Sequence, residues 1–269
     1  MTTESSQTGL PAVAGEPYAL VARDLTIAFG GITAVDQVTI GVRPGECLGL
    51  IGPNGAGKTT ILDCLSGLCP PTSGRVLLDG ADVSRRSGTW FSRAKVRRTF
   101  QRTQAFGWLS VEENVMIPLE LHGRFKYLLP EILRLPSARR RAGRMRQAAD
   151  DVLRECGLTE VKDSPAAAIP IGQLRMLEFA RAIIDTPRLL LLDEPTSGLG
   201  SAQSERVAEF IREVKGKRDC SIILVEHDVE FVMSLCDRII VLSQGRVLCE
   251  GSPEEVRRDP AVIDAYIGR

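Results

Sequence analysis

The sequence has no excess of charge of either sign, because 34 lysine and arginine residues balance 34 aspartate and glutamate residues over its 269 positions. Proteins whose main ligand is a polyanion usually carry a basic surplus. The balance therefore disfavours nucleic acid as the principal ligand, although short basic segments remain compatible with local contacts. We expect no nucleic-acid partner.

Long hydrophobic runs are also missing. No stretch of about 18 apolar residues occurs, so the sequence predicts no membrane-spanning helix. The first residues, Met1–Pro17, have neither a basic segment nor an apolar core and are rich in small and polar residues. They predict a flexible tail rather than a signal peptide. If such a chain works at a membrane, other subunits must hold it there.

Ligands for a structural metal are few. The chain has two histidines and seven cysteines, and the cysteines are scattered with no CxxC pair. This spacing disfavours a zinc site or a disulfide framework and favours a reducing cytosol as the compartment.

What is present is an alternation of short apolar strands with helices. The length fits one large α/β domain with a smaller lobe. Residues 18–42 contain β-branched runs typical of antiparallel strands, whereas residues 188–242 alternate strand and helix as parallel βαβ units do. Between these regions, residues 111–121, 138–156 and 173–184 have helical patterns.

One glycine-rich segment carries a specific motif. Gly52–Thr60 matches GxxxxGK[ST] and lies between an apolar strand and a helix, which distinguishes a phosphate-binding loop from a turn that binds nothing. Backbone N–H groups and the helix N-terminus bind phosphate, Lys58 supplies a cation, and Thr59 supplies a hydroxyl ligand to Mg²⁺. We assign nucleotide binding here to Asn54, Gly55, Gly57, Lys58, Thr59 and Thr60.

Two adjacent carboxylates follow the leucine-rich segment Leu189–Leu192. Successive side chains of a strand point to opposite faces, so Asp193 can serve the Mg²⁺ shell while Glu194 turns toward a water molecule. The alternative is an ordinary strand end with two solvated acids. The phosphate-binding loop elsewhere in the chain argues against it.

Together with Ser197–Leu199, these motifs resemble those of ABC-transporter ATPase domains, and the similarity covers about residues 18–269. The resemblance implies a P-loop NTPase core with a mainly parallel sheet, an antiparallel β flanking subdomain, and a helical subdomain at about residues 102–186. It also implies a C-terminal helix at about residues 260–268, and hydrolysis of ATP with Mg²⁺.

Three further residues match this family in the expected order. Gln101 resembles the Q-loop glutamine, which senses Mg²⁺ and the permease, and His227 resembles the switch histidine, which contacts the γ-phosphate. Phe29 resembles the aromatic residue that stacks on adenine. Taken singly, each has an ordinary alternative as a surface or core residue. The resemblance assigns catalysis to Glu194, His227 and Gln101, and Mg²⁺ binding to Thr59, Gln101 and Asp193.

The family's signature, usually Leu-Ser-Gly-Gly-Gln, is altered in this chain to Ile169–Gln173. Pro170 offers a phosphate neither an N–H group nor a hydroxyl. A second departure is Gly200, which stands where the family usually has Asp. We therefore expect weakened or asymmetric function. The resemblance implies that a partner's ATP is bound by Ile171, Gly172 and Gln173.

The same resemblance implies an assembly on the cytoplasmic face of the cell membrane. Its other members are two transmembrane permease subunits, a second ATPase subunit in a homo- or heterodimer and, indirectly, an external solute-binding protein. Phe29–Val35, Arg98–Gln101 and Val262–Gly268 look like segments of ATPases of branched-chain amino acid importers. Importers of urea or short amides and the lipopolysaccharide-export ATPase share parts of this pattern. We therefore predict import of a branched-chain amino acid or a related small solute, and the sequence does not identify which one.

Two features outside the motifs have competing interpretations. Phe106 and Trp108 are either core residues or the lining of a groove for a permease helix. The basic run Arg139–Arg141 is interpreted as a solvated helix face rather than a lipid-headgroup contact.

Other functions fit the sequence less well. Soluble ABC ATPases of DNA repair or translation typically have a coiled-coil insertion or two ATPase domains, whereas this chain has one phosphate loop and no sustained heptads. A phosphate-loop kinase does not need residues that activate water, as Gln101, Glu194 and His227 together would. A purely regulatory nucleotide-binding module would lack Glu194.

Overall fold

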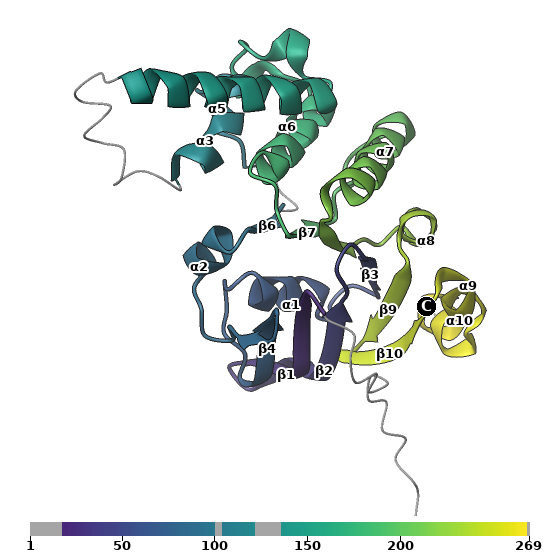
Figure 1. Ribbon diagram of the computed structural model, residues 1–269. Coiled ribbons are helices and arrows are strands. Elements are labelled where there is room, and N and C mark those ends of the chain that lie inside the picture. The colour runs from purple at the N-terminus through teal and green to yellow at the C-terminus, as the bar shows by residue number, and fades with distance from the viewer. Residues whose placement is uncertain (1–17, 100–103, 122–135, 268–269) are drawn as a thin grey trace, which may run out of the picture.

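The computed structural model describes residues 18–99, 104–121 and 136–267, which form two sheets and a helical lobe (Figure 1). The expected N-terminal tail at residues 1–17 lies outside this description. The elements follow the predicted P-loop core with an antiparallel flanking sheet and a helical subdomain, so the predicted fold class is confirmed.

The central sheet has six strands in the order β10-β9-β3-β8-β7-β6. All neighbours from β9 to β6 are parallel, and β10 is antiparallel to β9. The carboxyl ends of β3, β8, β7 and β6 therefore lie side by side at one edge of the sheet, where ligands bind in open α/β folds. The strands are β3 (Cys47–Ile51), β6 (Val96–Arg98), β7 (Leu189–Asp193), β8 (Ser221–Val225), β9 (Arg238–Ser243) and β10 (Arg246–Gly251).

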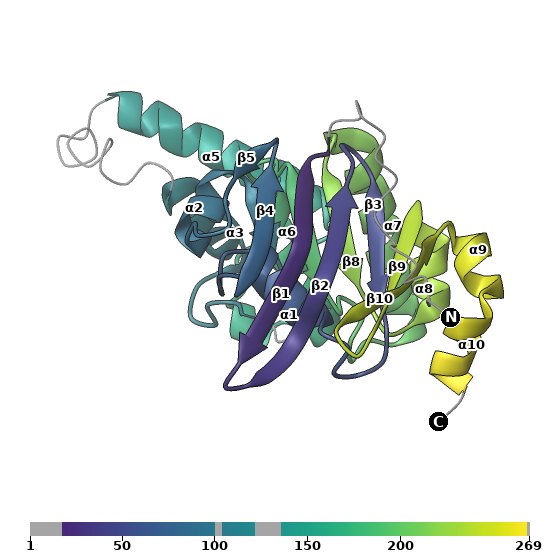
Figure 2. The same cartoon turned by 90° about the horizontal axis from the view of Figure 1, so that it is seen from below.

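The second sheet has the order β2-β1-β4-β5, and its pairs are antiparallel. Figure 2 shows β4, β1 and β2 side by side. The β-branched runs before Gly30 and Gly31 form one long strand, and those after these glycines form a second, so the chain turns back at this pair. The strands are β1 (Leu20–Phe29), β2 (Ile32–Val42), β4 (Ser73–Leu78) and β5 (Ala81–Asp82).

Helices cover the central sheet and build the lobe. The lobe contains α3, α5 and α6, and the C-terminal helices α9 and α10 lie beyond β10 (Figure 1). The described helices are α1 (Lys58–Leu65), α2 (Gly88–Arg93), α3 (Val111–Leu121), α5 (Pro136–Glu155), α6 (Ile171–Ile183), α7 (Ser201–Arg218), α8 (Val229–Leu235), α9 (Pro253–Arg258) and α10 (Pro260–Ile267).

Alternation along the central strands divides the core in two. On β7, Leu189 and Leu191 pack in a cluster with α1 and the antiparallel sheet, whereas Leu190 and Leu192 pack in a cluster with α6, α7 and α8. Successive side chains of a strand point to opposite faces, so a strand covered on both sides is apolar throughout. This explains why β7 and β8 are continuous apolar runs, each buried along its whole length.

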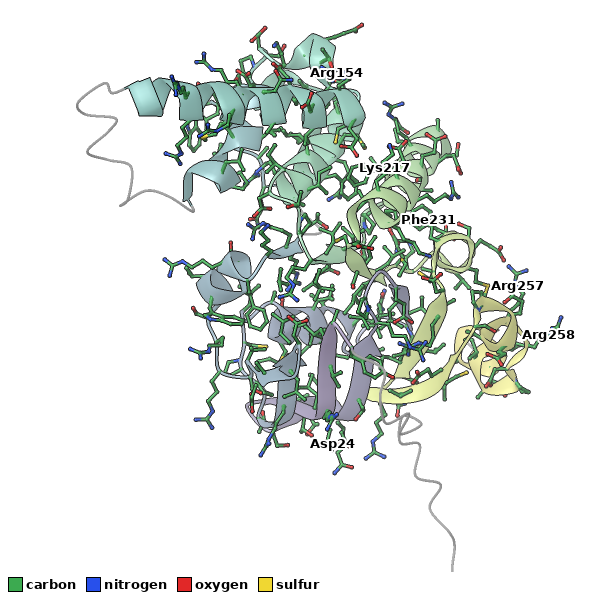
Figure 3. The ribbon with its side chains drawn as sticks, viewed as in Figure 1. Asp24, Arg154, Lys217, Phe231, Arg257 and Arg258 are labelled. Carbon is green, nitrogen blue, oxygen red and sulfur yellow. The ribbon has the colours of Figure 1, made fainter. Side chains whose placement is uncertain are left out.

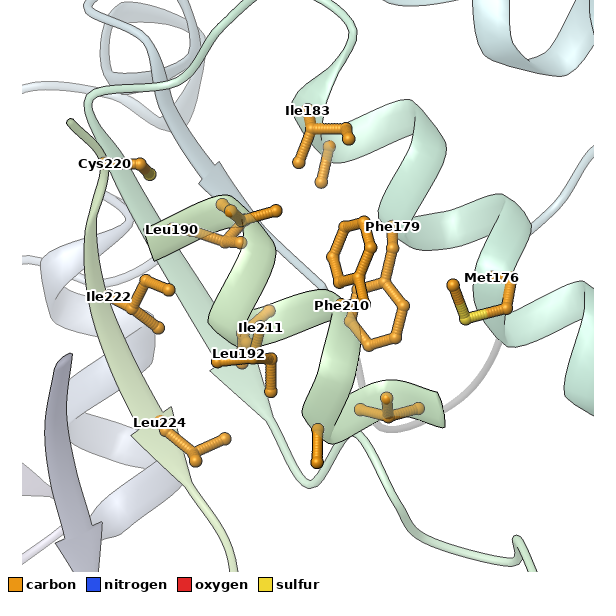
Figure 4. Close-up of a cluster of buried hydrophobic side chains, with 14 of the residues drawn as sticks. Met176, Phe179, Ile183, Leu190, Leu192, Phe210, Ile211, Cys220, Ile222 and Leu224 are labelled. Atoms are coloured by element: carbon orange, nitrogen blue, oxygen red, sulfur yellow. The ribbon is translucent and has the colours of Figure 1, made fainter. Parts of the chain in front are cut away.

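The second cluster joins the lobe to the central sheet. Phe179 of α6 stacks on Phe210 of α7 with their ring centroids 4.8 Å apart, and β7 supplies Leu190 and Leu192 beside them (Figure 4). Buried aromatic pairs of this kind contribute more than their surface area alone. They fix α6, which begins at the altered signature, against the sheet.

Helix α5 shows how the lobe is assembled. Ala149, Val152 and Leu153 recur at helical spacing and are buried, as is Cys156 directly after the helix, so the carboxyl-terminal half of α5 packs on the lobe. Its preceding turns are basic; Arg140 is exposed, as expected of a solvated face. Arg154 of α5 points outward, as do Lys217 of α7 and Arg258 of α9 (Figure 3).

Several elements differ from the sequence expectations. The helix Val111–Leu121 has the predicted bounds, whereas the alternation expected over residues 188–242 left the ends of α7, at Ser201 and Arg218, undefined. Both ends of α7 consist mainly of polar residues, so no periodic apolar pattern indicated where the helix begins or ends. Sequence reasoning also missed α2, a helix of six residues without a side-chain cap, and β10, an edge strand with no fully buried residue.

Within the described ranges, no helix is long and apolar enough to cross a membrane. In the same residues, no group of three or more histidine, cysteine, aspartate or glutamate side chains is arranged to hold a metal ion on its own.

Candidate functional site

Three chain segments with polar side chains meet at the carboxyl edge of the central sheet. The loop Gly52–Thr60 follows β3, Glu226 and His227 follow β8, and Asp193 and Glu194 end β7. Strand β8 lies between β3 and β7, so its polar end lies between the loop and the two carboxylates. The sheet order therefore brings together residues that are far apart in the sequence.

The loop after β3 requires glycine at two positions where its backbone lies close to the carbonyl oxygens of other segments. Gly57 has φ of 98°, and a Cβ atom there would lie 2.6 Å from the carbonyl oxygen of Ala34. At Gly52 a Cβ atom would lie 2.2 Å from the carbonyl oxygen of Leu242. Such distances exclude any side chain, so the loop closes tightly before α1 begins at Lys58. Gly55, at the exposed tip, is open on its Cβ side.

Lys58 lies inside this loop. Its Nζ donates hydrogen bonds to the carbonyl oxygens of Gly52 at 2.6 Å and Pro53 at 3.0 Å. Burial lowers the pKa of Lys58, while the charges of Glu194 and Asp193 raise that pKa in part. Both carboxylates thus lie close enough to the ammonium group to act on it. The predicted meeting of the phosphate loop with the two acids is present in the structure.

Asp193 is held by an arginine from the neighbouring strand. Arg98, at the end of β6, donates from Nη2 to Oδ2 of Asp193 at 2.9 Å and from Nη1 to Oδ1 of Asp63 at 2.6 Å. Asp63 belongs to α1, so one guanidinium group joins three elements around the site. A planar guanidinium can bind two carboxylates at once, which a lysine cannot do.

Glu194 adopts a backbone conformation that is uncommon for a residue with a side chain. Its φ is 45°, and its N–H donates to the carbonyl oxygen of Val225 at 2.9 Å. The chain therefore leaves the line of β7 at this residue and turns. This turn places Glu194 at the sheet edge, beside the end of β8.

Glu226 is completely buried between these segments. Its Oε1 accepts hydrogen bonds from the N–H of Thr196 at 2.8 Å and the hydroxyl of Thr196 at 2.5 Å. Its Oε2 accepts from the N–H of His227 at 3.2 Å and lies 3.4 Å from His227 Nδ1. The imidazole of His227 is exposed, at the same sheet edge as the phosphate loop.

The segment after the predicted Q-loop is bound to α6. Gln101 itself lies outside the described residues, so its role stays a prediction. Gln104 donates from its N–H to Oε1 of Glu178 at 2.7 Å, and Arg181 donates to the Gln104 carbonyl oxygen. Glu178 also pairs with Arg175 at 2.8 Å, and burial raises the pKa of Glu178.

Two exposed aromatic groups follow this segment. The ring of Trp108 packs edge-on against Phe106, with the centroids 5.8 Å apart, and Arg181 lies over Phe106 at 5.2 Å. Trp108 is 81% exposed, which excludes the core alternative for this residue. Phe29, at the end of β1, is also exposed and presents a ring on which a base could stack.

The altered signature is placed apart from the phosphate loop. Ile171 and Gly172 begin α6 and line a hollow of about 420 Å³ together with Gln203 and Arg206 of α7. The side chain of Gln203 lies over Gly172, at 3.1 Å from where a Cβ atom would be, and reaches toward Gly200. No residue of Gly52–Thr60 lines this hollow.

The donors around the loop fit Mg²⁺. The ion prefers hard oxygen ligands from hydroxyls and carboxylates. Thr59 presents an exposed hydroxyl-bearing side chain directly after Lys58, and Asp193 is the last residue of β7. Asp193 is one of the two carboxylates whose charge acts on Lys58.

Residues 35–197 match the sequence profile described as ABC transporter, more than half of the chain. The chain belongs to the ABC transporter ATP-binding family. A second profile, described as branched-chain amino acid ATP-binding cassette transporter, matches residues 246–269. This family hydrolyses ATP to drive transport, so the chain is an ATPase.

Relatives of this ABC ATPase are similar over nearly their whole length. It is 37% identical to the high-affinity branched-chain amino acid transport ATP-binding protein BraF of Pseudomonas aeruginosa, over 91% of this chain and 95% of BraF. It is 38% identical to LivG of Escherichia coli, which has the same description, over 91% and 95%. A crystal structure of a nucleotide-free ATP-binding cassette from an ABC transporter superposes with a TM-score of 0.79 at 26% identity, covering 94% of this chain and 100% of that one.

Sequence reasoning missed two residues of this ABC ATPase site. Arg98 opens the segment Arg98–Gln101 and Glu226 directly precedes His227, but the motifs assign neither residue a role. Each lies at the carboxyl end of a strand in the parallel sheet, the edge where ligands bind in such folds, and Glu226 directly follows the apolar run of β8. Their partners, Asp193 and Thr196, could not be read from the sequence, because the pairs are 95 and 30 residues apart.

Proposed function

We propose that this chain is the ATP-hydrolysing subunit of an ABC importer for branched-chain amino acids or a related small solute. The observation that carries the proposal is the convergence of Lys58, Asp193, Glu194 and His227 at one edge of the central sheet. A cation for phosphate, an acid for the metal, an acid for water and an imidazole together make up a site for nucleotide hydrolysis.

Nucleotide binding is assigned to the loop and its helix. Backbone N–H groups of Asn54, Gly55 and Gly57, with the N-terminus of α1, face the phosphates, and Phe29 stacks on the base. Lys58 exchanges the carbonyl oxygens of Gly52 and Pro53 for phosphate oxygens. Thr60 adds a second hydroxyl to the first turn of α1.

Mg²⁺ would be held by Thr59, Asp193 and Gln101, and its charge would offset the negative charge of the phosphates. Asp193 is pre-positioned for this by Arg98. Glu194 accepts a proton from the attacking water, and His227 donates to the γ-phosphate region. Because hydrolysis needs an in-line water, Glu194 is the residue whose loss costs most.

The signature supports a site shared between two subunits. Ile171, Gly172 and Gln173 lie at another helix start, around the hollow that the phosphate loop does not line. We therefore assign them to the ATP of a second ATPase subunit. The absence of a serine hydroxyl at Pro170 and of a carboxylate at Gly200 favours a heterodimer, in which the two ATP sites differ.

Permease subunits are the membrane attachment in this proposal, and they hold the chain at the cytoplasmic face. The exposed pair Phe106 and Trp108, next to the predicted Q-loop, supplies the apolar surface for a permease helix. The solute assignment is supported by the similarity to BraF and LivG and by the match at residues 246–269. Urea or amide import is the alternative within the same chemistry.

The test is affinity purification of the tagged chain from gently solubilised membranes, with mass spectrometry of the recovered proteins. Two different permeases and a second ATPase are expected. ATP hydrolysis by the recovered complex, reconstituted with its binding protein, should rise with leucine, isoleucine or valine and not with urea. Recovery of the chain alone, or with nucleic-acid machinery, would contradict the transporter role and leave the ATPase chemistry intact.

A further inference from the structure

Glu226 is a buried carboxylate that the proposed mechanism leaves without a role. It is fully buried and directly follows β8, which lies between the strand of the phosphate loop and the strand of Asp193. Burying a carboxylate costs free energy unless hydrogen bonds compensate. The hydrogen-bond partners of Glu226 therefore indicate why the protein keeps a carboxylate at this buried position.

The two oxygens of Glu226 have different partners. Oε1 binds Thr196 twice, through its N–H at 2.8 Å and its hydroxyl at 2.5 Å. Oε2 accepts from the N–H of His227 at 3.2 Å and lies 3.4 Å from His227 Nδ1. Thr196 follows Glu194 by two residues, so this one carboxylate joins the turn of Glu194 to the strand end of His227.

The turn at Glu194 needs such support. A φ of 45° is rarely adopted by a residue with a side chain, and it persists only where surrounding contacts hold it. The N–H of Glu194 is bound to Val225 at 2.9 Å, and Thr196 is bound to Glu226, the next residue along the chain. Both contacts come from the end of β8, so β8 sets where the turn lies.

We propose that Glu226 is a positioning residue, which fixes Glu194 and His227 relative to each other so that both act on one nucleotide. Its Oε1 sets the turn that carries the water-activating carboxylate. Its Oε2, beside Nδ1, orients the imidazole, since the partner of one ring nitrogen fixes the direction of the other. The inference rests on the roles of Glu194 and His227 in the proposed function.

The decisive variant is Glu226→Gln in the full chain, assayed with MgATP in the complex recovered with it. Glutamine keeps the size and the acceptor for Thr196, but it sets an amide group against the N–H of His227. We expect kcat to fall about 10- to 100-fold, because small misplacements of reacting groups have effects of this size. KM for ATP should change less than about twofold, because binding groups are untouched.

Double-mutant cycles identify the residue through which Glu226 affects kcat. Thr196→Val removes the hydroxyl that binds Oε1, and His227→Ala removes the imidazole. Because Glu226→Gln keeps the acceptor for Thr196 and disturbs the side facing His227, it should lower kcat much less in the His227→Ala background than in the wild type, and about as much in the Thr196→Val background as in the wild type. Glu230→Gln is the matched control, because Glu230 is an exposed carboxylate on α8 paired with Arg257, and its kcat should equal the wild-type value.

The outcomes separate this inference from the proposed function. Wild-type kcat in Glu226→Gln, with an inactive Glu194→Gln, overturns the positioning role and leaves the function standing. A parallel loss of ATP binding and melting temperature in Glu226→Gln also overturns it, because the residue would then support the fold alone. Full activity in Glu194→Gln contradicts the proposed catalytic role itself.

Discussion

At Arg98 a single guanidinium group holds two carboxylates from different elements, Asp63 of α1 and Asp193 of β7. The Arg98 side chain is 5% exposed and that of Asp193 is 4% exposed, so water does not screen the pair. Removing one partner of a buried ion pair leaves a buried charge without compensation. The position of Asp193, the carboxylate that we propose binds Mg²⁺, therefore depends on Arg98.

Arg98→Ala should destabilise the fold by about 3 kcal/mol or more, as expected when a buried ion pair is broken. Arg98→Lys should recover part of this loss, because one ammonium group can pair with only one of the two carboxylates. Urea denaturation of the purified chain measures both. Arg75→Ala, which removes the exposed pair with Asp82, is the control and should leave the midpoint unchanged. Equal midpoints for the Arg98 variants and the wild type would show that the ion pairs of Arg98 do not contribute to stability.

A buried thiol on α1 makes stability depend on alkaline pH. Burial, together with Cys69 and Asp63, raises the pKa of Cys64 from 9.0 to about 12. Between these values the unfolded chain has lost the proton that the folded chain still binds. By linkage, stability then falls as the pH rises above 9, and the loss ends as the pH passes the folded pKa.

Between pH 8 and pH 10 the contribution of Cys64 to this loss should be about 1.4 kcal/mol. Urea denaturation at both pH values, under reducing conditions, measures the loss in the wild type and in Cys64→Ala. The variant should lose less stability over this interval by that amount. Ile61→Val, one helical turn earlier, is the control, because it alters packing equally at both pH values. An identical pH dependence in Cys64→Ala and the wild type would contradict the prediction.

At the scale of elements, the sequence predicted strands better than helix ends. The strands β3, β7 and β8 are buried on both faces, so their apolar runs stop where the site begins. Helix ends such as those of α7 are polar and exposed, and no apolar period defines them. The motifs predicted which residues meet at the sheet edge, because parallel strands place their carboxyl ends together. The bonds of Glu226 could not be predicted, since they depend on the left-handed turn at Glu194.

Helix α6 should depend on one aromatic contact for its place. Phe179 is fully buried and stacks on Phe210 of α7 (Figure 4), so Phe179→Ala should cost about 3–5 kcal/mol through lost burial and the cavity left behind. Urea denaturation measures the change, and Ile263→Ala, on the exposed side of α10, is the matched control with little expected effect. A loss below 1 kcal/mol would mean that the lobe repacks around the missing ring.

Across the whole molecule, the phosphate loop and the altered signature, which we propose belong to two shared ATP sites, lie apart. The phosphate loop follows β3, whereas Ile171 and Gly172 line a hollow together with residues of α7. No residue of the phosphate loop lines this hollow. A second ATPase subunit is what would bring a loop to that hollow. The same lobe carries Trp108, so a permease bound there would lie against the helix that starts at the altered signature.

Trp108→Ala tests this arrangement at its most exposed point. Large aromatic side chains at the centre of an interface often contribute about 2 kcal/mol or more to binding, so the variant should recover several-fold less permease from membranes. The ring packs on Phe106 at the surface, and its loss should leave the melting temperature and ATP binding of the isolated chain unchanged. Leu68→Ala removes a side chain that is 57% exposed in the segment after α1, outside the helical lobe, and it should leave assembly intact. If both variants bind permease as the wild type does, the permease contacts another surface. Trp108 would then play no part in coupling ATP hydrolysis to transport.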